Sequence, residues 1–363
     1  MESNAKSQKK TAGKVVFTVL RRTLLSVFTL VMLVLVGLIM VCNLIFNGPS
    51  TSARDILTMS MLESSGMKWC PALFIGKDTG EDIRAEGSAT LPADMSDTSQ
   101  IVIQNGSSLG GSSEWDNYPD GIRLEEIKGD TYNAYVMLVR DPSRVYTATC
   151  TDDFSTVEYG LPLSAVMETE GAVAGVNGGA FFDDGTASSY VGSTPRGMVV
   201  SKGKIVFNDG TSYYGFVGLN EDNVLIVSTS INAQKGKDLR IRDGCCFGPV
   251  LVINGEINEA AYNQNSGYNP RTAIGQRADG TIILLCVDGR QVGSLGATYA
   301  DLTDIMIEYG AVNAMNLDGG SSTVMCRRDP ETNQLQVVNS YSLLQESPRR
   351  MPTYFLVRPL EEG

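Results

Sequence analysis

The longest apolar stretch of the chain lies close to its N-terminus. From Thr23 to Phe46 the chain has 24 residues without a charge, most of them Leu, Val, Ile, Phe or Met. At about 1.5 Å per residue, a helix of this length crosses a hydrocarbon core of roughly 30 Å. We therefore predict a single transmembrane helix at residues 23–46, which is the membrane contact of the protein.

Basic side chains precede this helix and predict its orientation. An excess of Lys and Arg marks the cytoplasmic side of a membrane helix, so residues 1–22 form a cytoplasmic tail and the chain after residue 46 is extracytoplasmic. A cleaved signal peptide is the alternative, but its apolar region is usually about 7–15 residues long. We therefore predict a single-pass protein of the cell membrane. The tail has one acidic residue, Glu2, and six basic residues: Lys6, Lys9, Lys10, Lys14, Arg21 and Arg22.

Regular patterning is absent just after the anchor and returns further along the chain. A short helical stretch is predicted near residues 53–63, and Gly106–Ser113 is flexible by composition. Residues 47–120 are therefore predicted to be a stalk or linker. From residue 121 to residue 360, short apolar runs alternate with turn signals, which indicates one globular domain with both helices and strands.

Three β-hairpins are predicted in this domain. Apolar runs flank turn residues at 198–207, at 250–255 and at 273–287, and Asn254-Gly255 is a strong signal for a type I′ turn. In the third hairpin, pairing across the turn sets residue 276 opposite residue 281. This register places Arg271 opposite Cys286.

A helix is predicted between the third hairpin and the next strand. Apolar residues recur at helical spacing from Leu302 to Tyr309, and Thr298 with Asp301 forms a capping box. The strands at 281–287 and 311–317 therefore belong to a βαβ unit and run parallel in one sheet. The predicted fold class is α+β: a strand-rich mixed sheet with antiparallel hairpins and at least one βαβ unit, preceded by the transmembrane helix.

Both strands of this unit end in an Asp-Gly pair. Asp288-Gly289-Arg290 follows the first strand, and Asp318 with Gly319, Gly320, Ser321 and Ser322 follows the second. Open α/β sheets bind ligands at the carboxyl ends of their strands, so the two carboxylates share one rim. The alternative is that each Asp-Gly pair is only a turn, and that the glycine loop after Asp318 is only flexible.

Further polar residues are predicted at the same rim. Asn269, Arg271 and Thr272 lie at the start of the strand that pairs with the first parallel strand. Asn177 follows the apolar run 172–176 and joins the rim if that strand belongs to the same sheet. Arg271 has an alternative role as a purely structural partner of Asp288.

Composition excludes several kinds of chemistry. The chain has no histidine, which removes the commonest general base and the commonest metal ligand. Outside residues 1–22 it has 23 basic and 40 acidic side chains, a net charge of −17, so nucleic acid is not an expected partner. Six cysteines outside the anchor permit three disulfides or remain buried thiols, and no C-x-x-C pair supports a zinc site.

Five short motifs form an ordered series that resembles the phosphodiester glycosidase family. The resemblance covers residues 121–360 and leaves the anchor and stalk outside. It implies hydrolysis of a sugar-1-phosphate diester, which frees the sugar and leaves a phosphomonoester. The motifs are Asn177-Gly-Gly-Ala-Phe-Phe182, Phe247-Gly-Pro-Val-Leu-Val252, Asn269-Pro-Arg-Thr-Ala-Ile-Gly275, Val287-Asp-Gly-Arg290 and Asn316-Leu-Asp-Gly-Gly-Ser-Ser322.

This reaction needs cations and N–H donors more than it needs a general acid. A phosphomonoester has a second pKa near 6 and leaves as an anion, whereas an alkoxide must be protonated. We assign phosphate binding to Arg271, Arg290 and the amides of Gly319, Gly320, Ser321 and Ser322. Asp288 and Asp318 supply the base or nucleophile. Asn177, Asn269 and Thr272 complete the substrate-binding set, with Asn177 at a sugar hydroxyl.

The sequence leaves open the use of a metal ion, the identity of the glycan and the type of function. No cofactor is required, but a calcium or magnesium ion held by Asp288 and Asp318 is an alternative. The expected partner is a phosphorylated glycan of the cell envelope or an exopolysaccharide. The alternative functions are a metal-dependent phosphodiesterase, which cuts the P–O bond, and a non-catalytic domain that binds anionic envelope polysaccharide.

Overall fold

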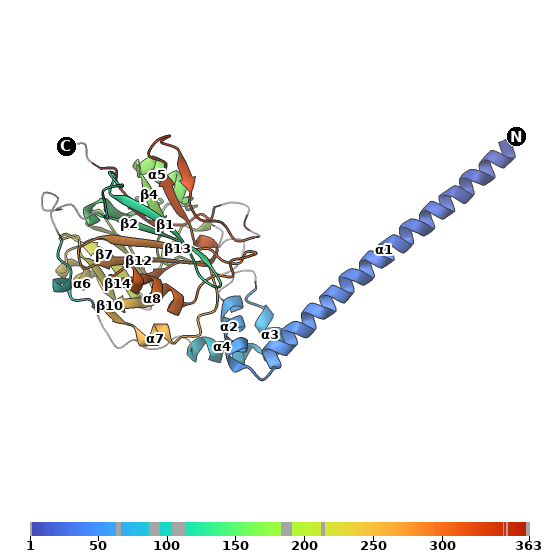
Figure 1. Ribbon diagram of the computed structural model, residues 1–363, viewed down its shortest axis with the longest axis horizontal. Coiled ribbons are helices and arrows are strands. Elements are labelled where there is room, and N and C mark those ends of the chain that lie inside the picture. Colours follow the sequence, from blue (N-terminus) through green and yellow to red (C-terminus); the bar gives the residue numbers. More distant parts are fainter. Residues whose placement is uncertain are drawn as a thin grey trace.

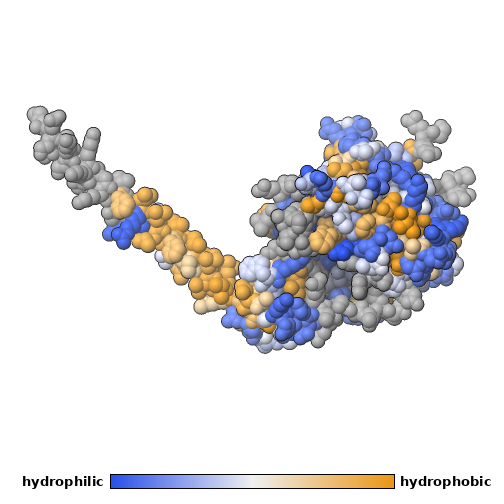
Figure 2. Space-filling view, turned by 180° about the vertical axis from the view of Figure 1, so that it is seen from behind, coloured by the Kyte–Doolittle hydropathy of each residue, from blue (hydrophilic) through white to orange (hydrophobic). Residues whose placement is uncertain are grey.

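The N-terminal helix projects from a globular unit (Figure 1). The computed structural model describes residues 2–62, 67–86, 95–103, 114–182, 191–211, 215–343, 345 and 348–360. Helix α1 covers Glu2–Asn47, and its part Leu20–Asn47 has an apolar stretch with a mean hydropathy of 2.9 and no buried residue within that stretch. Figure 2 shows apolar side chains along this part of α1, while the visible face of the globular unit is mixed. Length and composition are thus consistent with the predicted single membrane span.

Three short helices lie between α1 and the sheets. They are α2 (Thr51–Leu62), α3 (Cys70–Ile75) and α4 (Lys77–Glu86). Helix α3 packs against the end of α1, where the rings of Phe46 and Phe74 stack with their centroids 5.0 Å apart. The predicted helix near residues 53–63 is confirmed as α2.

A seven-stranded sheet forms the centre of the globular unit. Every neighbouring pair of its strands is antiparallel, and β12 lies between β13 and β14. Strands β13 and β14 are therefore parallel to each other, as predicted, although they do not pair directly. In order, the strands are β1 (Ile122–Lys128), β2 (Asn133–Val139), β13 (Ile282–Val287), β12 (Arg271–Arg277), β14 (Ala311–Leu317), β10 (Val250–Ile253) and β11 (Glu256–Ile257).

Helix α8 (Tyr299–Glu308) makes the crossover from β13 to β14. Thr298 and Asp301 form the predicted capping box. The apolar side of the helix covers one face of the sheet, where Leu302 packs with Val287 and Ala273. The predicted βαβ unit is thus confirmed with a strand inserted between its two parallel strands.

Two five-stranded sheets pack around the central sheet. One has the order β16 (Leu335–Val337), β15 (Met325–Arg328), β4 (Ala174–Asn177), β17 (Thr353–Val357) and β3 (Val145–Thr149). The other has the order β6 (Lys204–Asn208), β5 (Met198–Ser201), β9 (Ile241–Phe247), β7 (Gly215–Asn220) and β8 (Leu225–Ser228). Val176, Val217 and Leu284, one from each sheet, belong to one buried cluster, so the three sheets share a core. The smaller helices are α5 (Leu163–Glu170), α6 (Ala233–Asp238) and α7 (Glu259–Tyr262), with 3-10 turns at Thr98–Gln100, Pro142–Arg144 and Gly320–Ser322.

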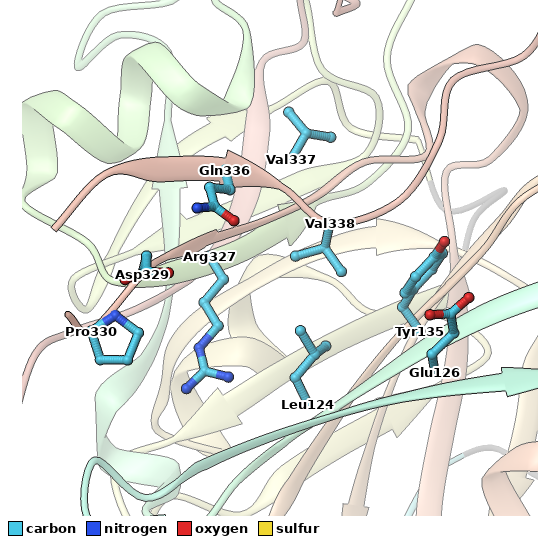
Figure 3. A pocket seen from close by; sticks show the side chains of 9 residues that line it. All are labelled: Leu124, Glu126, Tyr135, Arg327, Asp329, Pro330, Gln336, Val337 and Val338. Atoms are coloured by element: carbon cyan, nitrogen blue, oxygen red, sulfur yellow. The ribbon is translucent and has the colours of Figure 1, made fainter. Parts of the chain in front are cut away.

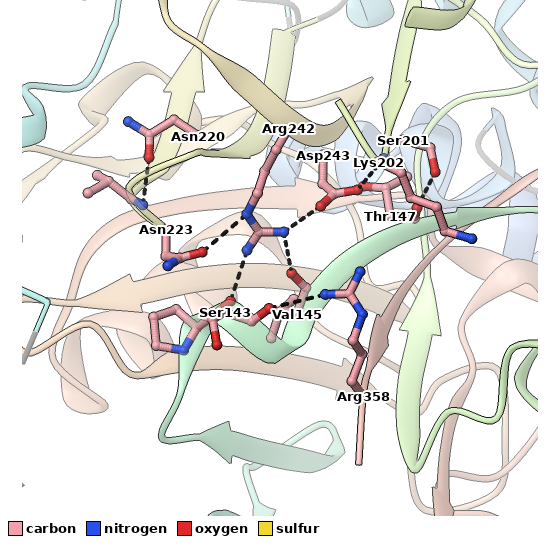
Figure 4. Close-up of polar contacts among 12 residues, drawn as sticks. Ser143, Val145, Thr147, Ser201, Lys202, Asn220, Asn223, Arg242, Asp243 and Arg358 are labelled. Carbon is pink, nitrogen blue, oxygen red and sulfur yellow. Dashed lines mark hydrogen bonds and ion pairs between the residues drawn. The ribbon is translucent and has the colours of Figure 1, made fainter. Parts of the chain in front are cut away.

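A buried ion pair ties the two smaller sheets together (Figure 4). Arg242 on β9 pairs with Asp243 and donates to the carbonyl oxygens of Pro142 and Val145, at 3.1 and 2.9 Å. Asp243 also accepts the Lys202 N–H at 3.0 Å. Burial raises the pKa of Asp243 above its ordinary value. The pair has hydrogen-bonding partners on β3 and in the turn between β5 and β6, which suits a structural role.

The predicted hairpins at residues 198–207 and 250–255 are confirmed. Strands β5 and β6 pair across residues 202–203, and β10 pairs with β11 across Asn254-Gly255. Both Asn254 and Gly255 have positive φ, at 56° and 79°, as a type I′ turn requires.

Parts of the predicted stalk belong to the globular unit. Ile101 and Trp115 are buried in core clusters of the sheets. The Ser96 N–H donates to the Val227 carbonyl at 2.9 Å, and the Val102 N–H donates to the Ala278 carbonyl at the same distance. The globular unit therefore takes in residues before 121. The predicted flexible segment Gly106–Ser113 lies outside the described residues.

The cysteines are free thiols in this structure. Cys245, Cys246, Cys286 and Cys326 are buried, and Cys42, Cys70 and Cys150 are partly exposed.

Candidate functional site

Two Asp-Gly turns lie at one edge of the central sheet. Asp288 follows the end of β13, and Asp318 follows the end of β14. Because these strands are parallel, both turns lie at the edge where β12 begins. The shared edge predicted from the sequence is therefore present in the topology.

The backbone of Asn269 and Pro270 separates the two turns, and we call this pair the wedge. An ideal Cβ on Gly289 would lie 2.6 Å from the Pro270 nitrogen, and one on Gly319 would lie 2.7 Å from the Pro270 oxygen. The Gly320 N–H donates to the same Pro270 oxygen at 2.8 Å. Both glycines after the aspartates are thus required by close approach of the wedge, and not only by turn geometry.

Asp288 is buried and held by the segment that follows β16. Its side chain is 1% exposed, and its Oδ1 accepts the Ser340 N–H at 2.9 Å and the Asn339 side-chain amide at 3.4 Å. Burial raises the pKa of Asp288, and these hydrogen bonds oppose the rise. Burial raises the pKa of the Tyr135 phenol, and the nearby charge of Asp288 adds to this rise.

Asp318 is more open than Asp288 and is fixed mainly through its backbone. The residue is partly exposed, its Oδ2 is buried, and its Oδ1 accepts the Gly319 N–H at 3.0 Å. Its backbone N–H donates to the Gly178 carbonyl at 3.1 Å, and its carbonyl oxygen accepts the Asn177 side-chain amide at 2.6 Å. The turn is thereby anchored while the carboxylate stays at the rim.

Asn177 reaches this rim from a different sheet. Strand β4 belongs to the sheet of β15 and β17, so the shared sheet on which the predicted place of Asn177 depended is not present, although Asn177 still bonds to the Asp318 backbone. The Asn177 Oδ1 accepts the Thr272 hydroxyl at 2.7 Å and the Val324 N–H at 3.1 Å. Asn177 and Thr272 are fully buried and bonded to each other. Their predicted contact with substrate stays a prediction.

Arg271 points away from the carboxylates. Its guanidinium donates to the carbonyl oxygens of Ser266 and Ala297, at 2.7 and 3.2 Å, and lies 4.4 Å from the centre of the Tyr299 ring. The side chain is only 5% exposed. Among the described residues, no ion pair joins it to Asp288. These contacts suit a structural role, and the predicted phosphate contact of Arg271 stays a prediction.

A one-residue error in register explains this orientation. Gln276 pairs with Ile282, and Arg271 pairs with Val287 instead of Cys286. Directly opposed residues share one face of a sheet, so Arg271 faces α8 with Val287. Thr272, which pairs with Cys286, faces the opposite side. The predicted register was wrong because the Arg277 N–H still bonds to the Thr281 carbonyl, so the loop comprises the three residues 278–280 instead of the predicted four.

Two other arginines flank the turn after Asp318. The Arg290 guanidinium donates to the Asn269 Oδ1 at 2.7 Å, and an ideal Cβ on Gly320 would lie 3.2 Å from its Nη1. The Arg349 Nη1 donates to the Ser321 hydroxyl at 3.1 Å and lies 3.5 Å from that of Ser322. The turn Gly320–Ser322 therefore has a guanidinium on each of two sides.

Arg349 was not predicted from the sequence. It follows Ser321 by 28 residues in a segment without regular structure, and no motif marks it. Its guanidinium also lies 4.8 Å from the centre of the Phe181 ring, in the motif that begins at Asn177. A single arginine in an irregular segment carries no signal of its position without the fold.

A groove of about 530 Å³ lies next to Asp288 (Figure 3). Leu124, Glu126 and Tyr135 line it from β1 and β2, and Arg327 enters it from β15. Its remaining lining residues are Asp329, Pro330, Gln336, Val337 and Val338. The wall at Val338 continues directly into Asn339 and Ser340, which hold Asp288. Mixed apolar and hydrogen-bonding walls suit a ligand with apolar faces and polar edges.

No group of three cysteine or acidic side chains is arranged to hold a metal ion in the described part of the chain. The alternative in which Asp288 and Asp318 hold a calcium or magnesium ion stays a prediction.

A model of the phosphodiester glycosidase family matches residues 170–358. This range is slightly more than half of the chain and contains both aspartates, Asn177, the wedge and Arg349. The match therefore covers the complete edge described above.

Two curated proteins are similar over part of their length. The SPbeta prophage-derived uncharacterized protein YomE of Bacillus subtilis (strain 168) is 32% identical over 152 residues, which are 41% of this chain and 20% of that protein. The N-acetylglucosamine-1-phosphodiester alpha-N-acetylglucosaminidase of Bos taurus is 29% identical over 142 residues, which are 35% of this chain and 27% of that protein. The matches thus span about a fifth and about a quarter of these relatives.

One solved structure has a similar fold. It is the catalytic domain of the zebrafish N-acetylglucosamine-1-phosphodiester alpha-N-acetylglucosaminidase, described as auto-inhibited by its pro-peptide. The TM-score is 0.54 at 21% identity, and the match covers 68% of this chain and 85% of that one. At this identity the likeness supports the fold alone.

Proposed function

This chain belongs to the phosphodiester glycosidase family, and from that premise we propose that it is a membrane-anchored hydrolase of sugar-1-phosphate diesters. It cleaves the bond between the anomeric carbon and the phosphate oxygen. The bovine relative is named for this kind of activity on an N-acetylglucosamine phosphodiester. We propose cell-envelope or exopolysaccharide glycans as the substrates.

The observation that carries the proposal is the carboxylate of a partly exposed aspartate, Asp318, beside a turn with two guanidinium groups. Asp318 is followed at once by the turn Gly320–Ser322, and Arg290 and Arg349 lie against that turn. A phosphodiester placed there has cations near its phosphate and a carboxylate near the sugar. Charge that develops on the leaving phosphate is stabilised by such fixed donors.

The reaction assigns different tasks to the two sides of this turn. Asp318 takes a proton from water, the water oxygen bonds to the anomeric carbon, and the bond from that carbon to the phosphate oxygen breaks. The electron pair stays on the phosphate, which Arg290 and Arg349 stabilise, so no general acid is required. Direct attack by Asp318 on the anomeric carbon is the other route, and both routes lose activity without its carboxylate.

Asp288 supports the site from beneath the surface. It holds residues 339–340, and these follow the groove wall at Val338. We propose that the groove accepts further sugar units of a glycan, since pyranose rings present C–H faces to Tyr135 and Leu124 and hydroxyl edges to Glu126.

Location at the membrane follows from α1 and its flanking charges. We propose that residues 23–46 span the membrane with the basic tail in the cytoplasm. The globular unit then lies outside the cytoplasm, where envelope glycans are accessible.

The test uses the full-length chain in detergent micelles with a GlcNAc-1-phospho-6-mannoside. Release of free GlcNAc and a mannose phosphomonoester, abolished in Asp318→Asn, is the expected result. Products that carry phosphate on GlcNAc would instead support a phosphodiesterase. No release from this compound or from a panel of other sugar-1-phosphate diesters would reject hydrolysis and leave polymer binding as the function.

A further inference from the structure

Helix α2, which follows the membrane span, contacts the loop that leads into the wedge. The Ser60 hydroxyl accepts the Tyr268 N–H at 3.0 Å and lies 3.5 Å from the Tyr268 carbonyl oxygen. These two residues are 208 positions apart. Thr58 and Met59 are buried on the same helix, so α2 is packed and not merely tethered.

Gly267 allows this close packing. It has a φ of +68°, and an ideal Cβ there would lie 2.7 Å from the Ser60 nitrogen and 3.0 Å from the Ile56 carbonyl oxygen. Both are backbone atoms of a helix, which cannot move aside as a side chain can. A larger residue at 267 would have to displace α2 or the loop.

The loop transmits this contact to both Asp-Gly turns through its backbone. The carbonyl oxygens of Ser266 and Gly267 accept the Arg271 guanidinium at 2.7 and 3.2 Å, so the segment on either side of the wedge is fixed. Pro270, inside that segment, accepts the Gly320 N–H at 2.8 Å. The wedge in turn leaves no room for a Cβ on Gly289 or Gly319.

We propose that α2 positions the active-site turns. The helix that joins the membrane anchor to the globular unit holds the loop 266–268, this loop fixes the wedge, and the wedge sets the spacing of the turns after Asp288 and Asp318. Ser60 and Gly267 are positioning residues that touch no substrate. The role in turnover rests on the proposed function, whereas the mechanical link does not.

The test compares three variants of the full-length chain in detergent micelles. Ser60→Ala removes the hydroxyl that bonds to Tyr268, and Gly267→Ala adds the excluded Cβ. Ser52→Ala is the matched control, because it removes an exposed hydroxyl from the same helix. Two quantities are measured: turnover of the GlcNAc-1-phospho-6-mannoside, and hydrogen exchange of the peptides that contain residues 266–271 and 318–323.

Ser60→Ala should lower kcat about fivefold while KM changes less than about twofold, because a single lost hydrogen bond is worth about 1 kcal/mol. Exchange should become faster in both peptides, and Gly267→Ala should show larger changes of the same sign. Ser52→Ala should match the parent in both measurements. A merely stabilising contact would leave kcat and the exchange of residues 318–323 at parental values, and that result would overturn the proposal.

The hydrogen-exchange measurement tests the positioning of the turns by α2 independently of the proposed hydrolysis. If the parent hydrolyses no sugar-1-phosphate diester, the proposed function fails. Faster exchange at residues 318–323 in Ser60→Ala would then still establish the mechanical link, and unchanged exchange would reject it.

Discussion

Asp288 and Asp318 end two parallel strands in the same way, yet they lie in different surroundings. Asp288 is 1% exposed beneath residues 339–340, and burial raises its pKa. Asp318 is partly exposed next to a turn with Arg290 and Arg349 beside it. One sequence signature, an Asp-Gly pair after a strand, thus occurs once in a buried setting and once in a partly exposed one.

The neighbours of each turn cause this difference. After β13, the chain segment beyond β16 covers Asp288 and supplies hydrogen bonds to its Oδ1. After β14, Asn177 and Gly178 bond to the backbone of Asp318, and this residue is partly exposed. The two aspartates therefore differ in burial, which the local sequence does not encode.

The largest expected effect is on turnover in Asp318→Asn. Loss of the rim carboxylate should lower kcat by about 10²–10⁴-fold, the usual contribution of a general base, while the melting temperature stays near that of the parent. Asp288→Asn should lose less activity, because its amide still accepts the Ser340 N–H. Steady-state kinetics with the GlcNAc phosphodiester check the ranking, and a larger loss in Asp288→Asn would reverse the comparison.

Arg349 and Arg271 should also differ, the first in its effect on activity and the second in its effect on stability. Arg349→Gln should lower kcat/KM by about 10–100-fold with an unchanged free energy of unfolding, because a hydrogen bond to a charged group is worth about 1.5–3 kcal/mol. Arg271→Gln should instead lower the free energy of unfolding by about 3 kcal/mol, since it leaves buried carbonyl oxygens without their donor. Denaturant unfolding and kinetics on both variants test this. Equal effects on activity would show that Arg271 also serves the substrate.

Both turns should be equally sensitive to a Cβ next to the wedge. Gly289→Ala and Gly319→Ala should each lower the free energy of unfolding by about 1–3 kcal/mol through overpacking. Gly80→Ala in α4 is the control, because a Cβ there meets nothing within 4 Å. Denaturant unfolding of the three variants measures the effect, and parental stability in both turn variants would exclude the wedge as the cause of the glycines.

The smallest effect concerns the pH dependence of stability. The raised pKa of Asp288 means that the folded state holds its proton more tightly than the unfolded state. The contribution of Asp288 to the free energy of unfolding is therefore fully present at acidic pH. It is lost as the pH rises through the pKa of Asp288 in the folded state. The loss is about 1.4 kcal/mol for each pH unit that separates the pKa of the folded state from that of the unfolded state.

Asp288→Asn should remove this pH dependence. The variant should be as stable as the parent or more stable at pH 7, and its relative advantage should shrink on acidification. Thermal unfolding from pH 4 to pH 8 measures this difference. An advantage that grows towards acidic pH would contradict the raised pKa.

The sequence predicted the elements of the site better than their orientations. Helix α8, the strands β13 and β14 and the shared edge follow from local periodicity, capping and the rule for parallel connections. The orientation of Arg271 did not, because the pairing of β12 with β13 is shifted by one residue from the predicted register, which places Arg271 on the face of Val287 and not of Cys286. Local signals fix a strand but leave its register open.

Two further features depend on contacts between distant segments. Arg349 reaches Ser321 from an irregular segment, and Ser60 reaches Tyr268 from the predicted stalk. Neither residue has a pattern that marks its partner. Gly289 and Gly319 are a related case. The sequence indicates a turn at each of them, but it does not show that Pro270 packs closely against both.

Hydrolysis in water enriched in ¹⁸O tests the central claim most directly. The full-length chain is incubated with the GlcNAc-1-phospho-6-mannoside, and the molecular mass of the phosphate-bearing product is measured by mass spectrometry. Attack at the anomeric carbon predicts a mannose phosphomonoester without ¹⁸O, formed by the parent and not by Asp318→Asn. Incorporation of ¹⁸O into any phosphate product would place the cleavage at a P–O bond and contradict the glycosidase account.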